Sequence, residues 1–244
     1  MSPEGPVEME GICLACGHCV AVCPQAAIDN TQTPLAGQIL IDRNLLPDEI
    51  QAEQFLRARR SVRCYKAETV AREKIMRLLD IARLAPSGGN TQGVSYHVVD
   101  DQALLREITA RTVDWMEGKI KEGDARGAYY AGMVAAYREQ GRDVVLRDAP
   151  CLIIALTPRT FQPRGRDNTH FSLAYAELMA PALGLGSCWA GVFESCAASG
   201  WEPLLSLLSI SEDMLVSGAL MVGIPRYTYQ RLVGRKPLQV SWQS

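Results

Sequence analysis

The sequence predicts a layered fold of the mixed α/β or α+β type, preceded by a small cysteine-bearing module. Apolar runs typical of buried strands, at 151–157 and 215–223, alternate with segments of helical periodicity. The 244 residues are 48% hydrophobic and 21% charged, which is enough apolar material for a sizeable core. We expect residues 1–47 to form the cysteine module and a linker, and residues 48–244 to form the main domain.

The charge and the apolar runs exclude several classes of function. The formal net charge is -2, and no basic patch indicates nucleic acid or a membrane surface. No apolar run is long enough to cross a bilayer, and the acidic N-terminus lacks the apolar stretch of a signal peptide. Eight cysteines in such a chain indicate reduced thiols or metal ligands. We therefore expect a cytoplasmic protein.

Helix signals are clear at the start of the main domain. Asp48 can cap a helix that runs to about Arg59, with Gln51 completing a capping box. A second helix is expected over 70–84, with Thr69 as its N-cap.

Further elements follow at regular intervals. Residues 94–99 alternate as a strand does, Asp101 begins a short helix, and 125–140 is the clearest helix of the charged region that follows. Asn168 is expected to cap a long helix that Gly184 ends.

The two ends of the chain carry weaker signals. Residues 26–29 resemble the short strand that ends a ferredoxin half. The last twenty residues hold Pro225, Pro237 and several arginines, and an extended arm is expected there.

The cysteine module carries a metal-ligand pattern. Cys13, Cys16, Cys19, Cys23 and Pro24 form the run C-x2-C-x2-C-x3-C-P, which is typical of [4Fe-4S] ligation and therefore of electron transfer. A structural zinc site is the alternative, although zinc sites usually separate two short cysteine spacings by a longer loop.

The cysteine run occurs once, and this makes its fourth ligand uncertain. In two-cluster ferredoxins the fourth cysteine of one run ligates the cluster of the other run. Either Cys23 or another thiol completes a single cluster, or the module is vestigial. The other cysteines, which are otherwise expected to be buried apolar side chains, are Cys64, Cys151, Cys188 and Cys196.

A dense basic cluster lies where the first helix of the main domain ends. It consists of Arg57, Arg59, Arg60, Ser61 and Arg63. Guanidinium groups suit bidentate phosphate binding, and the serine adds a hydroxyl donor. A solvated charged face is the alternative interpretation of this cluster taken alone.

Four segments in order resemble the FMN-dependent nitroreductase family. Arg59-Arg60-Ser61-Val62-Arg63 is similar to its flavin-phosphate motif. The others are 85–92 (APSGGNTQ), 184–191 (GLGSCWAG) and the pair 223–225 (GIP) and 235–238 (RKPL). The resemblance covers about residues 50–244. It is nearest to the subgroup with an N-terminal ferredoxin-like module, in which a run like Cys16–Pro24 also occurs.

The resemblance implies an α+β nitroreductase-like layered sandwich, with a central mixed sheet flanked by helices and a half-ferredoxin-like module at the N-terminus. It also implies an FMN site. Cations and the Ser61 hydroxyl would hold the phosphate, and amide side chains would meet the flavin edge. The implied cofactor residues are Arg59, Arg60, Ser61, Arg63, Pro86, Ser87, Gly88, Asn90, Gln92, Cys188, Trp189, Ala190, Gly191 and Arg235. The implied cluster ligands are Cys13, Cys16, Cys19 and Cys23.

The chain departs from the family pattern at two places. The usual Gln-Pro-Trp of the second motif is replaced by Gln92-Gly93-Val94, which leaves the substrate side of the ring less filled. Val233 occupies a position where a lysine is sometimes found, so the phosphate would depend more on the arginines at 59–63.

The implied activity is FMN-dependent reduction of a nitroaromatic, a quinone or a similar acceptor by alternate half-reactions. Electrons would come from NAD(P)H or from ferredoxin through the cluster. No catalytic protein residue is implied beyond the flavin. The resemblance also implies a homodimer with FMN at the interface. The alternative is an electron-transfer flavoprotein that passes electrons between an iron–sulfur donor and a partner, without a small-molecule substrate.

Overall fold

The computed structural model describes residues 13–243, so residues 1–12 of the expected cysteine module lie outside the described part. Its core is a sheet of four strands in the order β1-β2-β4-β3, in which every pair is antiparallel. The strands are β1 (Ser95–Val99), β2 (Cys151–Pro158), β3 (Gly186–Trp189) and β4 (Met214–Gly223). The expected mixed sheet is therefore corrected: these strands pair antiparallel, and an isolated parallel bridge joins Ser61 to Ser187.

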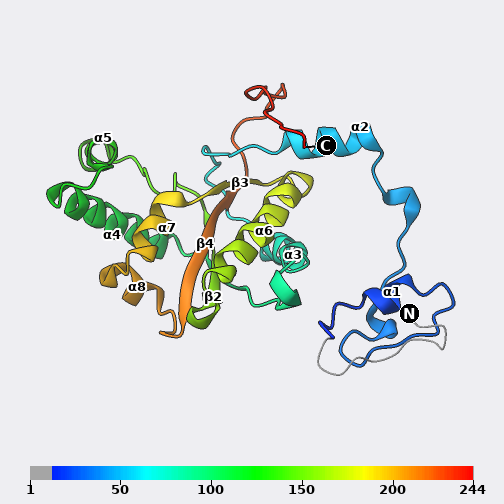
Figure 1. Cartoon of the computed structure of the whole chain (residues 1–244). Coiled ribbons are helices and arrows are strands. Elements are labelled where there is room, and N and C mark those ends of the chain that lie inside the picture. The colour runs from blue at the N-terminus through cyan, green and yellow to red at the C-terminus, as the bar shows by residue number, and fades with distance from the viewer. Residues whose placement is uncertain (1–12, 244) are drawn as a thin grey trace.

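Helices cover both faces of the sheet (Figure 1). One face is covered by α3 (Arg72–Ala82) and α6 (Arg164–Met179), and the other by α4 (Gln102–Lys121), α5 (Gly127–Gln140), α7 (Gly191–Ala198) and α8 (Glu202–Leu208). Strand β2 explains why both faces need covering. Leu152 and Ile154 belong to one apolar cluster, and Ile153 and Ala155 to the other. Burial on both faces is the reason that β2 is an unbroken apolar run.

The remaining helical elements lie at the N-terminal side and in the connections. They are α1 (His18–Val22), α2 (Glu49–Ala58) and the 3-10 turns η1 (Leu35–Gly37), η2 (Arg43–Leu45), η3 (Gly88–Asn90), η4 (Arg159–Phe161) and η5 (Ala180–Leu183). The expected capping box is confirmed, because Asp48 accepts from the Gln51 N–H and Gln51 accepts from the Asp48 N–H. Gly184 ends η5 with φ 70°, as expected of a helix-ending glycine.

Three expectations about helix starts are corrected. The second helix begins at Arg72 rather than after Thr69, because Ala71, with ψ 133°, is not yet helical and serves as the N-cap. Asp101 does cap its helix through the Leu104 N–H, but α4 is 20 residues long. Asn168 lies inside α6, buried, and its side chain accepts from the Gly88 N–H instead of capping.

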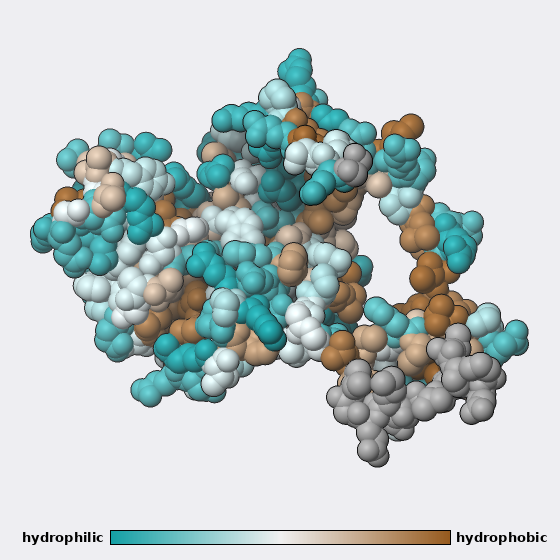
Figure 2. Space-filling view, in the orientation of Figure 1, coloured by the Kyte–Doolittle hydropathy of each residue, from teal (hydrophilic) through white to brown (hydrophobic). Residues whose placement is uncertain are grey.

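The N-terminal segment differs from the ferredoxin half that the sequence predicts. Residues 26–29 form no strand; the Asp29 carboxylate accepts from the N–H groups of Asn30 and Leu35 and so makes a turn. The segment is joined to α2 by a linker whose apolar side chains face solvent, with Ile39 and Leu40 each 94% exposed (Figure 2). Within the described residues, no helix is both long and apolar enough to cross a membrane.

A close approach at Gly186 holds the 61–65 segment against the sheet. The Val62 N–H donates to the Ser187 carbonyl at 2.9 Å, and a Cβ at Gly186 would lie 2.7 Å from Val62 Cγ2. The neighbour is a buried, β-branched side chain, which cannot move aside cheaply.

We therefore expect Gly186→Ala to lower the free energy of unfolding by about 1–3 kcal/mol, through overpacking. Urea denaturation followed by circular dichroism measures this. Gly132→Ala on α5 is the matched control, because nothing lies near its added Cβ. Equal stability of the two variants would contradict the close approach.

Candidate functional site

The basic segment at 59–63 is extended, so its side chains point to different sides. Arg60 lies over the Tyr229 ring, 5.0 Å from its centroid, beside a cavity of 360 Å³. Arg63 lines a different cavity, of 310 Å³. An extended chain alternates its side chains, and this separates Arg60 from Arg63.

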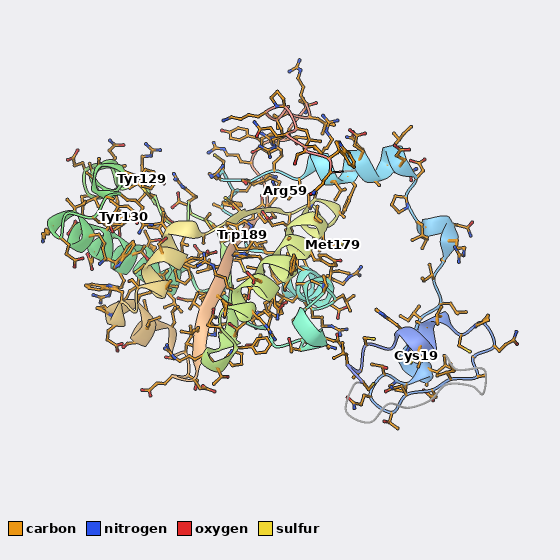
Figure 3. The ribbon with its side chains drawn as sticks, viewed as in Figure 1. Cys19, Arg59, Tyr129, Tyr130, Met179 and Trp189 are labelled. Carbon is orange, nitrogen blue, oxygen red and sulfur yellow. The ribbon has the colours of Figure 1, made fainter. Side chains whose placement is uncertain are left out.

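Glu177 on α6 connects Arg59 to the turn at the end of β3. One carboxylate oxygen of Glu177 accepts from Arg59 Nη1 at 3.2 Å, and the other accepts from Trp189 Nε1 at 2.7 Å. Arg59 and Trp189 are labelled in Figure 3. The Glu177 side chain is only 7% exposed. A buried carboxylate needs such partners, so Glu177, Arg59 and Trp189 form one interlocked unit. In the sequence, the signal for Glu177 is that it is a lone acidic residue within an otherwise apolar stretch of α6.

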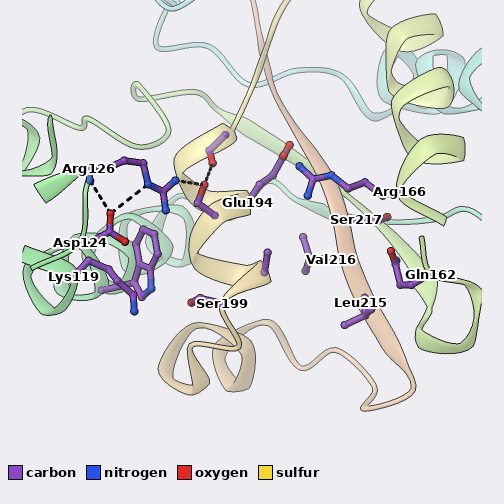
Figure 4. A pocket seen from close by; sticks show the side chains of 14 residues that line it. Lys119, Asp124, Arg126, Gln162, Arg166, Glu194, Ser199, Leu215, Val216 and Ser217 are labelled. Carbon is purple, nitrogen blue, oxygen red and sulfur yellow. Dashed lines mark hydrogen bonds and ion pairs between the residues drawn. The ribbon is translucent and has the colours of Figure 1, made fainter. Parts of the chain in front are cut away.

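The largest cavity at the site has a volume of 740 Å³ and lies between the sheet end and the loop joining α4 to α5 (Figure 4). Arg126 on its wall is held by Asp124 at 3.5 Å and donates to the Ser195 hydroxyl at 3.5 Å. Glu194 also lines this cavity and accepts from the Ala219 N–H; burial raises the pKa of its carboxyl.

The 310 Å³ cavity adjoins the larger one, because Arg126, Gly191 and Ser195 line both. Trp115 lines the larger cavity and Tyr130 the smaller. The Trp115 Nε1 and Tyr130 OH atoms are buried, and within residues 13–243 they have no hydrogen-bond partner. Each of the two volumes, 740 and 310 Å³, lies in the range of small-molecule sites, about 300–1,000 Å³.

The turn from β3 into α7 borders both cavities. Gly191 begins α7, and the residues just before it are Cys188, Trp189 and Ala190. The Cys188 thiol donates to the Trp189 carbonyl, and burial raises its pKa although Arg63 and Arg147 oppose the shift. Cys188 is therefore a protonated, buried side chain rather than a nucleophile.

The second motif lies apart from the arginines. The Gly88 N–H donates to Asn168 at 2.9 Å, and Gln92 donates both to Ser87 and to Asn90. Asn90 Nδ2 donates to the carbonyls of Leu14 and Ala15 in the cysteine run. Within residues 13–243, no hydrogen bond or ion pair joins residues 86–92 to residues 59–63. Pro86, the second residue of the motif, is exposed.

The remaining expected site residues lie at the periphery. Arg235 is exposed in the C-terminal arm, which runs near α2 (Figure 1). Cys13, Cys16 and Cys19 are exposed and Cys23 is half-buried. Hydrogen bonds from backbone N–H groups, Ala27 first, lower the pKa of Cys23. In the described part of the chain, no three Cys, His, Asp or Glu side chains converge as metal ligands.

The fold is a four-stranded antiparallel sheet covered by helices on both faces, with two adjoining cavities beside the β3–α7 turn. The Nitroreductase family model matches residues 56–224. A protein of Archaeoglobus fulgidus, provisionally described as an NADH dehydrogenase/NAD(P)H nitroreductase, is 26% identical over 176 residues, 71% of this chain and 84% of that protein.

Solved structures of the same fold carry FMN. A nitroreductase of Desulfitobacterium hafniense with bound FMN matches with a TM-score of 0.63 and 22% identity, covering 78% of this chain and 97% of that one. A nitroreductase of Bacteroides fragilis with bound FMN matches with a TM-score of 0.61 and 21% identity, covering 80% of this chain and 100% of that one.

The chain belongs to the nitroreductase family, since the family model covers most of it. Family membership, together with solved FMN complexes of this fold, supports an FMN-dependent oxidoreductase. The α+β fold predicted from the four motifs is thereby confirmed.

Proposed function

We propose that this protein binds FMN beside the β3–α7 turn and uses it to reduce a nitroaromatic, a quinone or a similar acceptor. The observation that carries the proposal is the pair of adjoining cavities, of which Gly191 borders both and Arg63 borders the smaller. Bound FMN supplies hydride and electron transfer between a reduced donor and the acceptor.

The residues present fit the chemistry of this cofactor. Arg63 and the Ser61 hydroxyl offer donors to a phosphate, and the exposed Gly191 leaves room for backbone to approach a ring. Glu177 orients Arg59 and Trp189 behind that surface. The high pKa of Cys188 keeps the thiol protonated, so it contributes no competing thiolate.

NAD(P)H is the proposed electron donor. The archaeal relative is named for NADH and NAD(P)H. The sequence of this chain contains no separate dinucleotide-binding fingerprint. The donor and the acceptor would therefore use the same cavity in turn. Such use of one cavity is expected to give alternate half-reactions.

We propose a homodimer, and the distribution of the motifs supports it. Residues 86–92 lie apart from the arginines in one protomer, and a second copy could bring its own loop to the same FMN. Exposed apolar side chains in the linker and the C-terminal arm also favour a partner surface: Ile39 and Leu40 are each 94% exposed and Trp242 is 92% exposed. We propose that FMN lies at the interface between two copies.

The cysteine run is proposed to bind a [4Fe-4S] cluster and to receive electrons from ferredoxin. Its support is the ligand spacing, and the lowered pKa of Cys23, which favours a thiolate. The four cysteines do not converge as ligands in the described residues, so no step of the reduction is assigned to the cluster. Asn90, bonded to Leu14 and Ala15, connects the cysteine run to the second motif.

Anaerobically purified protein, reconstituted with FMN, iron and sulfide, tests these proposals together. We expect one FMN per protomer, and reduction of the flavin absorbance by NADH or NADPH followed by reoxidation with a nitroaromatic or a quinone. Absence of bound flavin would contradict the proposed function. Rapid reduction by ferredoxin with sluggish turnover of every acceptor would indicate an electron carrier instead.

Metal analysis of the same sample tests the cysteine run separately. Iron and acid-labile sulfide are expected, and both are expected to fall when Cys16→Ser and Cys19→Ser are combined. Cys64→Ser is the matched control, because Cys64 lies outside the run and is exposed, not buried as the sequence predicted. Zinc without iron would contradict the cluster and leave the FMN proposal intact.

A further inference from the structure

Three arginines line the 310 Å³ cavity: Arg63, Arg126 and Arg147. Among the described residues that line it there is no aspartate or glutamate. Arg126 shares its charge with Asp124, but neither Arg63 nor Arg147 has an ion-pair partner within residues 13–243. The cavity therefore carries uncompensated positive charge. Because Arg63 is proposed to hold the FMN phosphate, the charge that remains for a second anionic group is that of Arg147 and, in part, of Arg126.

A turn with an unusual backbone conformation places Arg147 at this cavity. Arg147 and Asp148 both have left-handed backbone angles, φ 59° and 55°, which are uncommon for residues other than glycine. The Asp143 carboxylate holds the turn by accepting from the N–H groups of Val145, Leu146 and Asp148. It also accepts from the Thr109 hydroxyl on α4. One carboxylate thus fixes the conformation that brings Arg147 to the cavity wall.

Arg126 is held on the same wall from the other side. Its guanidinium lies 5.2 Å from the centroid of the Tyr130 ring and donates to Ser195. The Tyr130 side chain is only 1% exposed, so the ring on which Arg126 packs is fixed in the core. The guanidinium is thereby held at the cavity wall from two sides, by the ring and by Ser195.

The other walls of the cavity suit a flat molecule. Tyr129 and Trp189 contribute aromatic rings, and Val144 and Val145 contribute apolar surface. Gly191 and Trp189, which border the proposed FMN site, line the same cavity. An occupant held by the arginines would therefore lie next to the flavin.

We propose that Arg147 and Arg126 bind the anionic group of the acceptor, and that the preferred acceptors are planar aromatic carboxylates. A carboxylate can accept two parallel hydrogen bonds from one guanidinium fork, which orients the ring as well as attracting it. This inference rests on the proposed FMN-dependent reduction and adds the class of acceptor to it.

Single-turnover reoxidation tests the proposal without requiring knowledge of the natural donor. FMN-loaded protein is photoreduced anaerobically and mixed with 4-nitrobenzoate or with its neutral analogue 4-nitrobenzamide, while the flavin absorbance is followed. In the reaction the nitro group takes up two electrons and two protons from the reduced cofactor and yields the nitroso product and water. The measured quantity is the ratio of the two second-order rate constants, carboxylate over amide.

We expect Arg147→Gln to lower this ratio roughly ten- to hundredfold, because a charge-assisted hydrogen bond is lost for one acceptor alone. Arg147→Lys is expected to recover part of it, since the charge remains and the fork does not. Arg106→Gln, an exposed arginine on α4 outside the cavity, is the matched control and is expected to leave the ratio unchanged.

The outcomes separate this proposal from the function on which it rests. If the native protein binds FMN and is reoxidised by both acceptors, but Arg147→Gln and Arg126→Gln leave the ratio unchanged, the arginine site is wrong and the enzyme class stands. If these variants weaken FMN binding without changing the ratio, the cavity holds the cofactor phosphate and the proposal is overturned. If the native protein binds no FMN, both the proposed function and the proposed acceptor site are contradicted.

Discussion

Replacing Glu177 with methionine is expected to lower the free energy of unfolding by about 3 kcal/mol. The substitution leaves the Arg59 guanidinium, whose side chain is 26% exposed, without its carboxylate, and leaves the Trp189 indole N–H without an acceptor. Both groups lose contact with water on folding, and in the native protein the Glu177 carboxylate replaces that water as their partner. Urea denaturation followed by circular dichroism measures the change.

The matched controls separate a lost charge from lost packing. Glu177→Gln retains an oxygen for the Trp189 N–H, so its cost is expected to be smaller than that of methionine. The double variant Glu177→Met with Arg59→Met is expected to be more stable than Glu177→Met alone, because no unpaired charge remains. A loss below about 1 kcal/mol for Glu177→Met would show that the pair behaves as an exposed one.

Replacing Arg63 with glutamine is expected to weaken FMN binding by about 2 kcal/mol, roughly thirtyfold. Among the arginines of the basic segment, Arg59 is bonded to Glu177 and Arg60 lies against the Tyr229 ring. Arg63 donates within the segment only to the Ser61 carbonyl, at 3.4 Å, so its charge is available to the cofactor. Fluorescence titration with FMN measures the dissociation constant.

Two comparisons sharpen the Arg63 experiment. Arg63→Lys retains the charge and is expected to lose less affinity than glutamine. Raising the salt concentration is expected to weaken binding to the native protein more than binding to Arg63→Gln, because this arginine supplies part of the electrostatic attraction. An unchanged dissociation constant for Arg63→Gln would remove this arginine from the cofactor site.

Local signals along the chain were sufficient for most elements. The capping box of Asp48 and Gln51, the strand of residues 95–99 and the helix-ending Gly184 depend on near neighbours in sequence, and the structure confirms all three. Asn168 was misassigned for the opposite reason. Its side chain has the chemistry of a cap, but a backbone N–H 80 residues away, at Gly88, uses it instead.

The direction of the neighbouring strands also could not be predicted from local sequence. The apolar run of β2 indicated burial on both faces, and the structure confirms that burial. The run contained no information about which strand lies beside it or in which direction. Parallel and antiparallel neighbours both bury a two-sided strand, so only the chain path around it decides the pairing.

The sequence by itself determined the family, the residues that can hold an anion and the cysteine spacing, because these are properties of residue type and order. Only the tertiary structure decided which of those residues meet. Arg59 binds Glu177, 118 residues away, while Arg63 joins Arg126 and Arg147 at a cavity that no local pattern describes. Such contacts arise when helices and strands pack. The free energy of packing depends on the whole core, whereas capping and periodicity depend on a few adjacent residues.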